Sequence, residues 1–343
     1  MGNDSYRLVE VEIDPFQVSV IIPDYNAAAY VNQAVESALA QPETAEVLLI
    51  EDGSPDNALE VCKELADKYE EVKLLRHPNG ENRGAGASRN LGMRNASCEY
   101  IAFLDADDYC LPGRFAAASE IFRLDPACEG VYEAVAMQVE SGEGMERWQA
   151  AGKSASQLQT MSPGIPPEDL AKVLIKGNKG YFQLNGLVIR KTVLEKSGFM
   201  NENLRLHQDT EFILRVALTS HLLPGRLDTP VAMWRVHPAN RVSAPRSMLN
   251  QYKDRMKFWF NLYRWVKRHG SRQQQSLVRE AALRFNRSHK YFAKFPRNLF
   301  PDTLIIISRQ LRLLAYPELW IDRSPNSSGE KTDHNSRIQR SDL

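Results

Sequence analysis

The chain has 343 residues, 43 basic and 43 acidic side chains and 43% hydrophobic residues, a composition typical of a soluble globular protein with a sizeable core. It contains no continuous apolar run of the 18 or so residues that a membrane span needs, and its first 16 residues lack the basic and apolar regions of a signal peptide. The four cysteines lack Cys-x-x-Cys spacing, which argues against a zinc site and a disulfide framework and favours a cytoplasmic location.

The neutral total hides two regions of opposite charge. Residues 1–240 contain 22 Lys and Arg against 35 Asp and Glu, whereas residues 241–343 contain 21 against 8. Such a division predicts modules with different partners. We expect a leader over residues 1–16, a main domain over 17–240, a basic amphipathic helical region over 241–321 and a disordered tail over 322–343.

Strands and helices alternate in the first third of the chain. Apolar runs end in small polar clusters, and amphipathic stretches with helical spacing lie between them. This alternation predicts an α/β fold with a largely parallel sheet and right-handed crossovers. The expected order is a strand from 17, a helix over 30–39, a strand over 47–50, a helix over 55–69 with Ser54 as its N-cap, a strand over 72–75, a helix over 85–96 and a strand over 100–104.

Beyond residue 108 the pattern is mixed. The region rich in Gly, Ser, Gln and Pro over 140–167 predicts a loop that covers the site. The other expected elements are a helix over 112–124, a strand over 130–139, a strand over 184–189, a helix over 209–218, a strand over 227–236 interrupted at Pro230, and two or three amphipathic helices from 247 onward.

Carboxylates follow two of the predicted strands, at the edge where open α/β sheets bind ligands. Asp52 can accept the N3–H of a uracil base, although taken alone it would more often cap the next helix. Asp105 and Asp107 are separated by one residue, and such carboxylates repel each other unless a cation lies between them. Hard oxygen ligands suit Mg²⁺ or Mn²⁺, which would bridge the protein to a diphosphate. Residues 82–90 match neither a P-loop nor a Gly-x-Gly-x-x-Gly motif.

In combination, these motifs resemble the family 2 glycosyltransferases of the GT-A fold over roughly residues 17–240. The resemblance implies a Rossmann-like mixed, mostly parallel sheet flanked by helices, here followed by a helical C-terminal appendage. It implies that Asp107 is a metal ligand and that Asp105 faces the ribose. Independently of the resemblance, we expect Asp108 to cap the following turn. The residues expected at the nucleotide sugar are Pro23, Tyr25, Asn26, Asp52, Arg89, Asp105 and Ala106.

Two further positions follow from the resemblance. The family usually has Glu-Asp where this chain has Gln208-Asp209, so the role of general base is expected of Asp209 alone. An N-capping role is the alternative for Asp209. His237 corresponds to a histidine that can complete the metal shell, although most lone histidines are structural.

The resemblance implies an inverting hexosyl- or N-acetylhexosaminyltransferase that uses a nucleoside-diphosphate sugar, most simply a UDP-sugar, and a hydroxyl acceptor of carbohydrate or lipid-linked type. Surface polysaccharide or glycolipid synthesis is the expected setting. An inactive scaffold and a sugar-phosphate nucleotidyltransferase are the alternatives. The basic residues after 247 suit an anionic membrane surface, which would make the protein peripheral, or form an ordinary solvated face; no nucleic-acid-binding module is visible.

Overall fold

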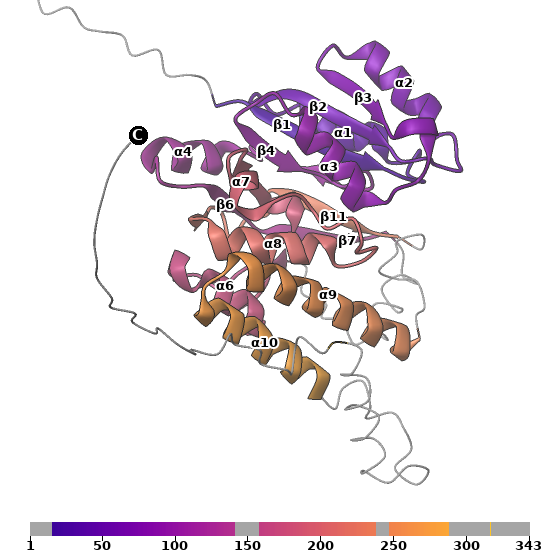
Figure 1. Cartoon of the computed structure of the whole chain (residues 1–343). Helices are drawn as coiled ribbons and strands as arrows, with labels where there is room; N and C mark the ends of the chain where they lie inside the picture. The colour runs from indigo at the N-terminus through magenta and orange to yellow at the C-terminus, as the bar shows by residue number, and fades with distance from the viewer. Residues whose placement is uncertain (1–15, 141–157, 238–246, 288–315, 317–343) are drawn as a thin grey trace, which may run out of the picture. The chain divides into compact units, whose positions relative to one another are not determined.

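The computed structural model describes residues 16–140, 158–237, 247–287 and 316 (Figure 1). The described residues up to 287 belong to one unit, residues 1–293, and Tyr316 belongs to a second, residues 294–343. The predicted leader up to residue 15, most of the predicted loop over the site, a third C-terminal helix and the tail lie outside the described residues.

A seven-stranded sheet forms the centre of the first unit. Its order is β10-β6-β9-β4-β1-β2-β3, in which β1, β2, β3 and β4 run parallel and β9 runs antiparallel to both β4 and β6. The prediction of a mixed, mostly parallel sheet is therefore confirmed. The strands are β1 (Val18–Asp24), β2 (Thr44–Glu51), β3 (Val72–Arg76), β4 (Tyr100–Phe103), β6 (Gly130–Tyr132), β9 (Leu187–Arg190) and β10 (Leu222–Pro224).

Helices cover both faces of this sheet. Helices α1 (Val31–Leu39) and α2 (Ala58–Lys68) share a core with Val20 and Ile22 of β1, whereas α3 (Ala85–Asn95) packs on the opposite face. Gly92 permits that approach, because a Cβ there would lie 2.6 Å from Cγ2 of Ile21. Helix α8 (Gln208–Thr219) lies on the same face as α3, where Phe212 meets Phe103 edge to face.

A second, four-stranded sheet supports the end of β4. Its order is β5-β11-β7-β8, with bounds Tyr109–Cys110, Ala232–Val236, Val135–Val139 and Leu158–Gln159. Strand β5 follows the Asp105–Asp108 turn directly and pairs antiparallel with β11, which ends just before His237. This pairing brings residues more than a hundred positions apart to the same edge of the molecule.

The remaining helices are α4 (Ala116–Leu124), α6 (Pro167–Lys176), α7 (Val193–Ser197), α9 (Met248–His269) and α10 (Arg272–Arg287), with 3₁₀ turns η1 (Pro78–Gly80) and η2 (Leu184–Gly186). Helix α9 contacts α8 and α10, and α10 contacts α6. Tyr252, Met256 and Val266 of α9 are buried, so the C-terminal helices pack against the main fold. Among the described helices, none has the length and apolar character of a transmembrane segment.

Several predicted elements differ from the structure. The strand expected over 227–236 is confined to β11, the helix expected from 112 begins at Ala116, and β10 was not predicted. Residues 130–139 form two strands in different sheets, because the chain turns at Glu133, which is buried against Arg114. The helix expected from Pro55 begins at Ala58, and Ser54 is not its N-cap. The backbone N–H of Ser54 instead donates to Glu51 Oε1 at 2.5 Å, and its hydroxyl accepts from the N–H of Asn26 at 3.2 Å.

Candidate active site

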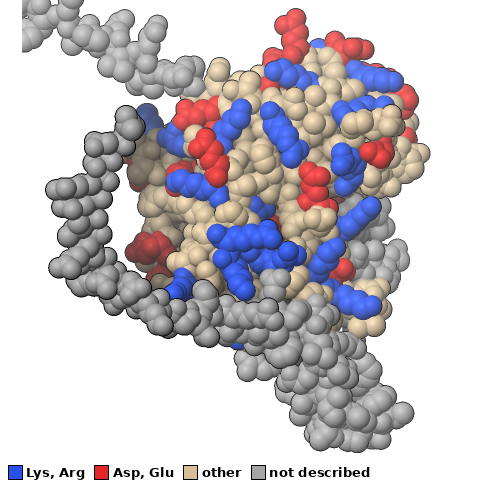
Figure 2. Space-filling view, viewed as in Figure 1, with Lys and Arg blue, Asp and Glu red and all other residues tan. Residues whose placement is uncertain are grey.

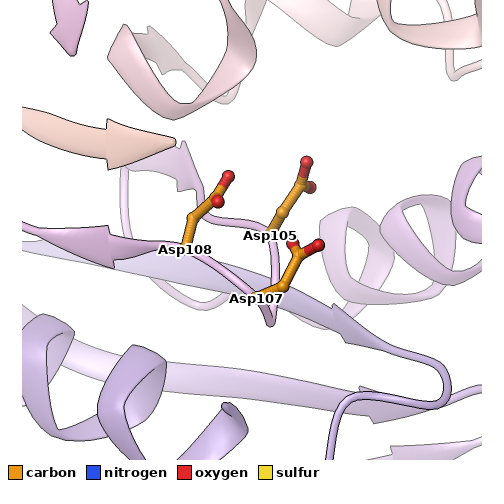
Figure 3. A group of neighbouring side chains, drawn as sticks. All are labelled: Asp105, Asp107 and Asp108. Atoms are coloured by element: carbon orange, nitrogen blue, oxygen red, sulfur yellow. The ribbon is translucent and has the colours of Figure 1, made fainter. Parts of the chain in front are cut away.

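A tight turn after β4 gathers three carboxylates. Asp105, Asp107 and Asp108 each place one oxygen within 4.8 Å of the others, and Figure 3 shows the three side chains on the same side of the turn. The N–H of Asp108 donates to the carbonyl of Asp105 at 3.0 Å, which closes the turn. Ala106 between them is buried.

Asp108 anchors the cluster to its surroundings. It is 1% exposed, and its carboxylate accepts from Asn185 Nδ2 at 2.5 Å and from the N–H of Arg235 at 2.7 Å. Burial, followed by the charges of Asp107 and Asp105, raises the pKa of Asp108 well above its usual range. The prediction that Asp108 caps the following turn is wrong, because its carboxylate reaches β11 and η2 instead.

His237 and Arg89 complete the cluster from two other elements. His237 Nε2 lies 3.1 Å from Asp107 Oδ2, and the imidazole packs on the Tyr30 ring with centroids 4.7 Å apart. Arg89 of α3, which is 5% exposed, forms an ion pair with Asp105. The structure therefore brings the predicted residues Arg89, Asp105, Asp107 and His237 together.

The donor set fits a divalent cation of the Mg²⁺ or Mn²⁺ type. These ions prefer carboxylate oxygens. Burial is the main cause of the raised pKa of Asp108, and a bound cation would offset the second cause, the repulsion from Asp107 and Asp105. Asp107, with Asp105 or Asp108 and His237 nearby, would hold it.

Asp52 lies at the end of β2 but has internal partners. It is 1% exposed, and its oxygens accept from the N–H groups of Arg83 and Gly84, both at 2.8 Å, and from Asn82 Nδ2 at 3.2 Å. It therefore holds the loop that leads into α3 and does not cap α2. Contact between Asp52 and a base stays a prediction.

The segment Pro23-Asp24-Tyr25-Asn26 turns sharply at the end of β1. Tyr25 is 44% exposed, and Asn26 adopts a left-handed conformation with φ 57°. Asp24 is fully buried, its Oδ2 accepts from Cys62 Sγ at 3.3 Å and its Oδ1 has no hydrogen-bond partner among the described residues. Burial raises the pKa of Asp24 to about 6.

Asp209 occupies the first turn of α8. Its Oδ1 accepts from the N–H of Thr210 at 2.7 Å and from the Thr210 hydroxyl at 3.3 Å, and that hydroxyl lies 3.5 Å from the hydroxyl of Tyr181. Burial, and next the charge of Asp209, raise the pKa of Tyr181. The residue at the N-cap position is His207, so Asp209 is not the N-cap of α8.

A small cavity links the start of α8 to the start of α3. Gln208 shares its lining with residues 83–87, so the base candidate Asp209 follows a residue that faces the helix carrying Arg89. The first turn and a half of α3 therefore contacts both parts of the predicted site. Its start lies beside Gln208, which precedes Asp209, and its Arg89 pairs with Asp105.

Comparison with known proteins indicates the same family that the sequence motifs resemble. The sequence profile described as "Glycosyl transferase family 2" matches residues 19–179. An uncharacterized glycosyltransferase of Nostoc is 31% identical over 65% of this chain and 66% of its own length. The chain belongs to glycosyltransferase family 2.

Two other relatives align over shorter stretches. An uncharacterized glycosyltransferase of Haemophilus influenzae is 43% identical over 27% of this chain and 36% of its own length. The succinoglycan biosynthesis protein ExoU of Rhizobium meliloti is 42% identical over 29% of both chains. This chain therefore spans less than two thirds of the length of these relatives.

Solved structures of TarS from S. aureus have a similar fold. Residues 1–349 of TarS superpose with a TM-score of 0.58 at 16% identity, covering 88% of this chain and 81% of TarS. The TarS complex with UDP-GlcNAc gives 0.57 at 17% identity, covering 82% and 74%. The prediction of a GT-A fold is confirmed.

Sequence reasoning missed three residues of the site. Asp24 lies between the predicted residues Pro23 and Tyr25 but carries no special pattern, and its burial comes from packing against α2. Asn185 donates to Asp108 and accepts from the N–H of Asp105, yet it lies 77 residues beyond Asp108. Tyr30 opens the helix predicted over 30–39, and no local signal indicates that its ring meets His237.

Proposed function

We propose that this family 2 chain is an inverting glycosyltransferase that transfers a sugar from a nucleoside diphosphate, in the first instance UDP, to an acceptor hydroxyl. The observation that carries the proposal is the acidic cluster after β4, with Arg89 and His237 beside it. UDP as the nucleotide is suggested by TarS, which has been solved with UDP-GlcNAc.

In the proposed reaction, Asp209 accepts the proton of the acceptor hydroxyl. The acceptor oxygen forms a bond to the anomeric carbon while the bond from that carbon to the diphosphate oxygen breaks, and a single displacement of this kind inverts the configuration. Thr210 orients the carboxylate through Oδ1, and Oδ2 has no hydrogen-bond partner among the described residues. Glu211 is a weaker candidate because Arg215 holds both of its oxygens, at 2.9 and 2.8 Å.

The leaving diphosphate belongs at the acidic cluster. A divalent ion held by Asp107 and its neighbours would neutralise the developing charge. Arg89 fixes the carboxylate of Asp105 toward the ribose, and the ring of Tyr25, which is 44% exposed, is available to the base. Pro23, Asn26, Asp52 and Ala106 shape the same end of the sheet.

The C-terminal helices offer a basic surface. Figure 2 shows Lys and Arg side chains gathered over the region of α9. Lys253, Lys257, Lys267 and Arg268 of α9 are exposed. We propose that this surface meets an anionic membrane carrying a lipid-linked acceptor, at the cytoplasmic side, which suits surface polysaccharide synthesis as in the succinoglycan relative.

A turnover screen tests the proposal. The protein is incubated with UDP-, GDP- and dTDP-sugars, with Mn²⁺, with Mg²⁺ or with EDTA, and release of the nucleoside diphosphate is followed. We expect slow, metal-dependent release from one nucleotide class. Release from none of them, or equal release in EDTA, would remove the proposed activity.

A further inference from the structure

The cavity at the start of α8 has no role in the chemistry described so far. It lies between residues 83–87, the segment 202–205 and Gln208, and it holds about 10 Å³. That is the room of roughly one water molecule or one small functional group.

Gln208 lines this cavity without a partner. It is 7% exposed, its Oε1 is buried, and neither end of its amide is hydrogen-bonded within the described part of the chain. Buried amides are nearly always paired in folded proteins. An unpaired one facing a cavity indicates a group that the chain itself does not supply.

The first turn of α3 forms the opposite wall. The N–H groups of Arg83 and Gly84 are taken by Asp52, but those of the first helical turn have no partner within the helix. Gly86 keeps this wall open, because a Cβ there would lie 3.3 Å from Cγ of Gln208. The cavity is therefore lined by backbone donors and by an amide that can both donate and accept.

These groups fit a hydroxyl better than an anion. A hydroxyl donates to Oε1 of Gln208 and accepts from the amide or from α3, whereas a phosphate or carboxylate oxygen would leave Oε1 unpaired. The charged residues of the lining, Glu202, Arg83 and Arg205, are all exposed, so solvent screens their charges. Glu202 also accepts from Asn90 Nδ2 at 2.9 Å and has Arg94 at 3.8 Å. The usual family residue at position 208, a Glu, would present only acceptors when ionised.

The position of the cavity indicates whose hydroxyl it takes. Gly86 precedes Arg89 by one turn of α3, about 4.5 Å along the axis, and Arg89 pairs with Asp105 of the diphosphate side. Asp209, the proposed base, follows Gln208 directly. The group that lies between a diphosphate and this base is the sugar being transferred.

We propose that Gln208 and the first turn of α3 form a subsite for one hydroxyl of the transferred sugar, and that Gln208 is a specificity-determining residue for the donor. This inference rests on the proposed function, since it needs a nucleotide sugar at the acidic cluster.

Calorimetry on the full chain with Mn²⁺ tests the subsite. The affinities of UDP and of UDP-glucose, UDP-galactose and UDP-GlcNAc are measured for the wild type, Gln208→Leu and the exposed control Gln273→Leu. We expect Gln208→Leu to lower the ratio of sugar-nucleotide to UDP affinity about tenfold, the worth of one or two hydrogen bonds, with UDP affinity unchanged. The control should behave as wild type.

Monodeoxy analogues of the preferred donor close a double-mutant cycle. One analogue should lose the same tenfold in the wild type and lose nothing further in Gln208→Leu. An unchanged affinity ratio in Gln208→Leu, or equal binding of all deoxy analogues by the wild type, overturns the subsite while UDP binding still supports the transferase. Should Gln208→Leu fail to fold, the wild-type deoxy series alone decides. Absence of any metal-dependent nucleotide binding overturns both proposals.

Discussion

Two groups of charged side chains differ in how their charges are balanced. Arg114 and Glu133 are 1% and 0% exposed and neutralise each other, with Nη1 and Oε2 3.0 Å apart. The turn after β4 instead brings Asp105, Asp107 and Asp108 together, three carboxylates whose oxygens lie within 4.8 Å. The first arrangement is complete within the protein and serves the fold. The second leaves like charges facing each other, a repulsion that protonation of Asp108 or a bound cation relieves.

The same contrast separates neighbours in α8. Glu211 is held at both oxygens by Arg215, one turn further along the helix. Asp209 has only Thr210 as a hydrogen-bond partner among the described residues, and Gln208 has none. The places of these three residues in the sequence do not distinguish a structural from a functional role. Whether their polar atoms have hydrogen-bond partners within the described part of the chain does.

The largest effect is expected from Asp209→Asn. Asn keeps the size of the side chain and the hydrogen bond from Thr210 but cannot take a proton, so turnover should fall about 10²–10⁴-fold. Nucleotide affinity should stay within a few-fold. Single-turnover rates and calorimetry on the same protein measure the two quantities, and near-native turnover would leave His207 or Glu211 as the residues to test.

Breaking the neutralised pair should damage the fold and leave binding intact. Arg114→Met strands the buried carboxylate of Glu133, which typically costs about 3–5 kcal/mol of unfolding free energy. Urea denaturation measures it, with the exposed Arg123→Met as control. Adding Glu133→Gln should recover part of the loss. A change in unfolding free energy below about 0.5 kcal/mol would show that the Arg114–Glu133 pair does not stabilise the fold.

Asp24 provides a pH-dependent test of buried charge. Its pKa in the folded protein is about 6 against 3.8 for the free group, so between these values the folded state binds more protons than the unfolded state. Wild-type stability should therefore fall as pH rises from 4 to 6, and remain lowered above 6, by up to about 3 kcal/mol.

Asp24→Asn removes that dependence. The stability difference between variant and wild type should grow in favour of Asn from pH 4 to pH 7, as measured by denaturation at each pH. The exposed Asp67→Asn serves as the control. A difference that does not change with pH would show that Asp24 does not ionise in this way.

The smallest effect concerns the exposed charge of α9. Reversal of Lys253, Lys267 and Arg268 to Glu should weaken co-sedimentation with phosphatidylserine vesicles at low salt, since each basic residue near such a surface contributes about 1 kcal/mol. The wild-type interaction should fade as salt rises. Equal sedimentation, or no salt effect, would make α9 an ordinary solvated face. The matched control reverses exposed basic residues elsewhere, namely Lys63, Arg123 and Lys179.

Much of the fold was predictable because strands β1, β2 and β4 are apolar runs that end in polar clusters. The acidic turn was predictable for the same reason, since Asp105 and Asp107 directly follow a buried strand. The partners of Asp108 were not, because Asn185 and Arg235 reach it only through η2 and β11. Asp52 was predictable only in part. The sequence indicates its place at the sheet edge, but not that the N–H groups of Arg83 and Gly84 donate to its oxygens.

We propose that the carboxylates after β4 bind a cation together with a diphosphate. Calorimetric titration of UDP measures this in the wild type with Mn²⁺, in the wild type with EDTA and in Asp107→Ala with Mn²⁺, with Asp67→Ala as control. We expect strong binding in the first case and in the control, and a loss of about a hundredfold in the other two, because a direct ligand of the metal is worth at least the 10–100-fold of an outer-shell partner. Equal affinity in all of them would contradict it.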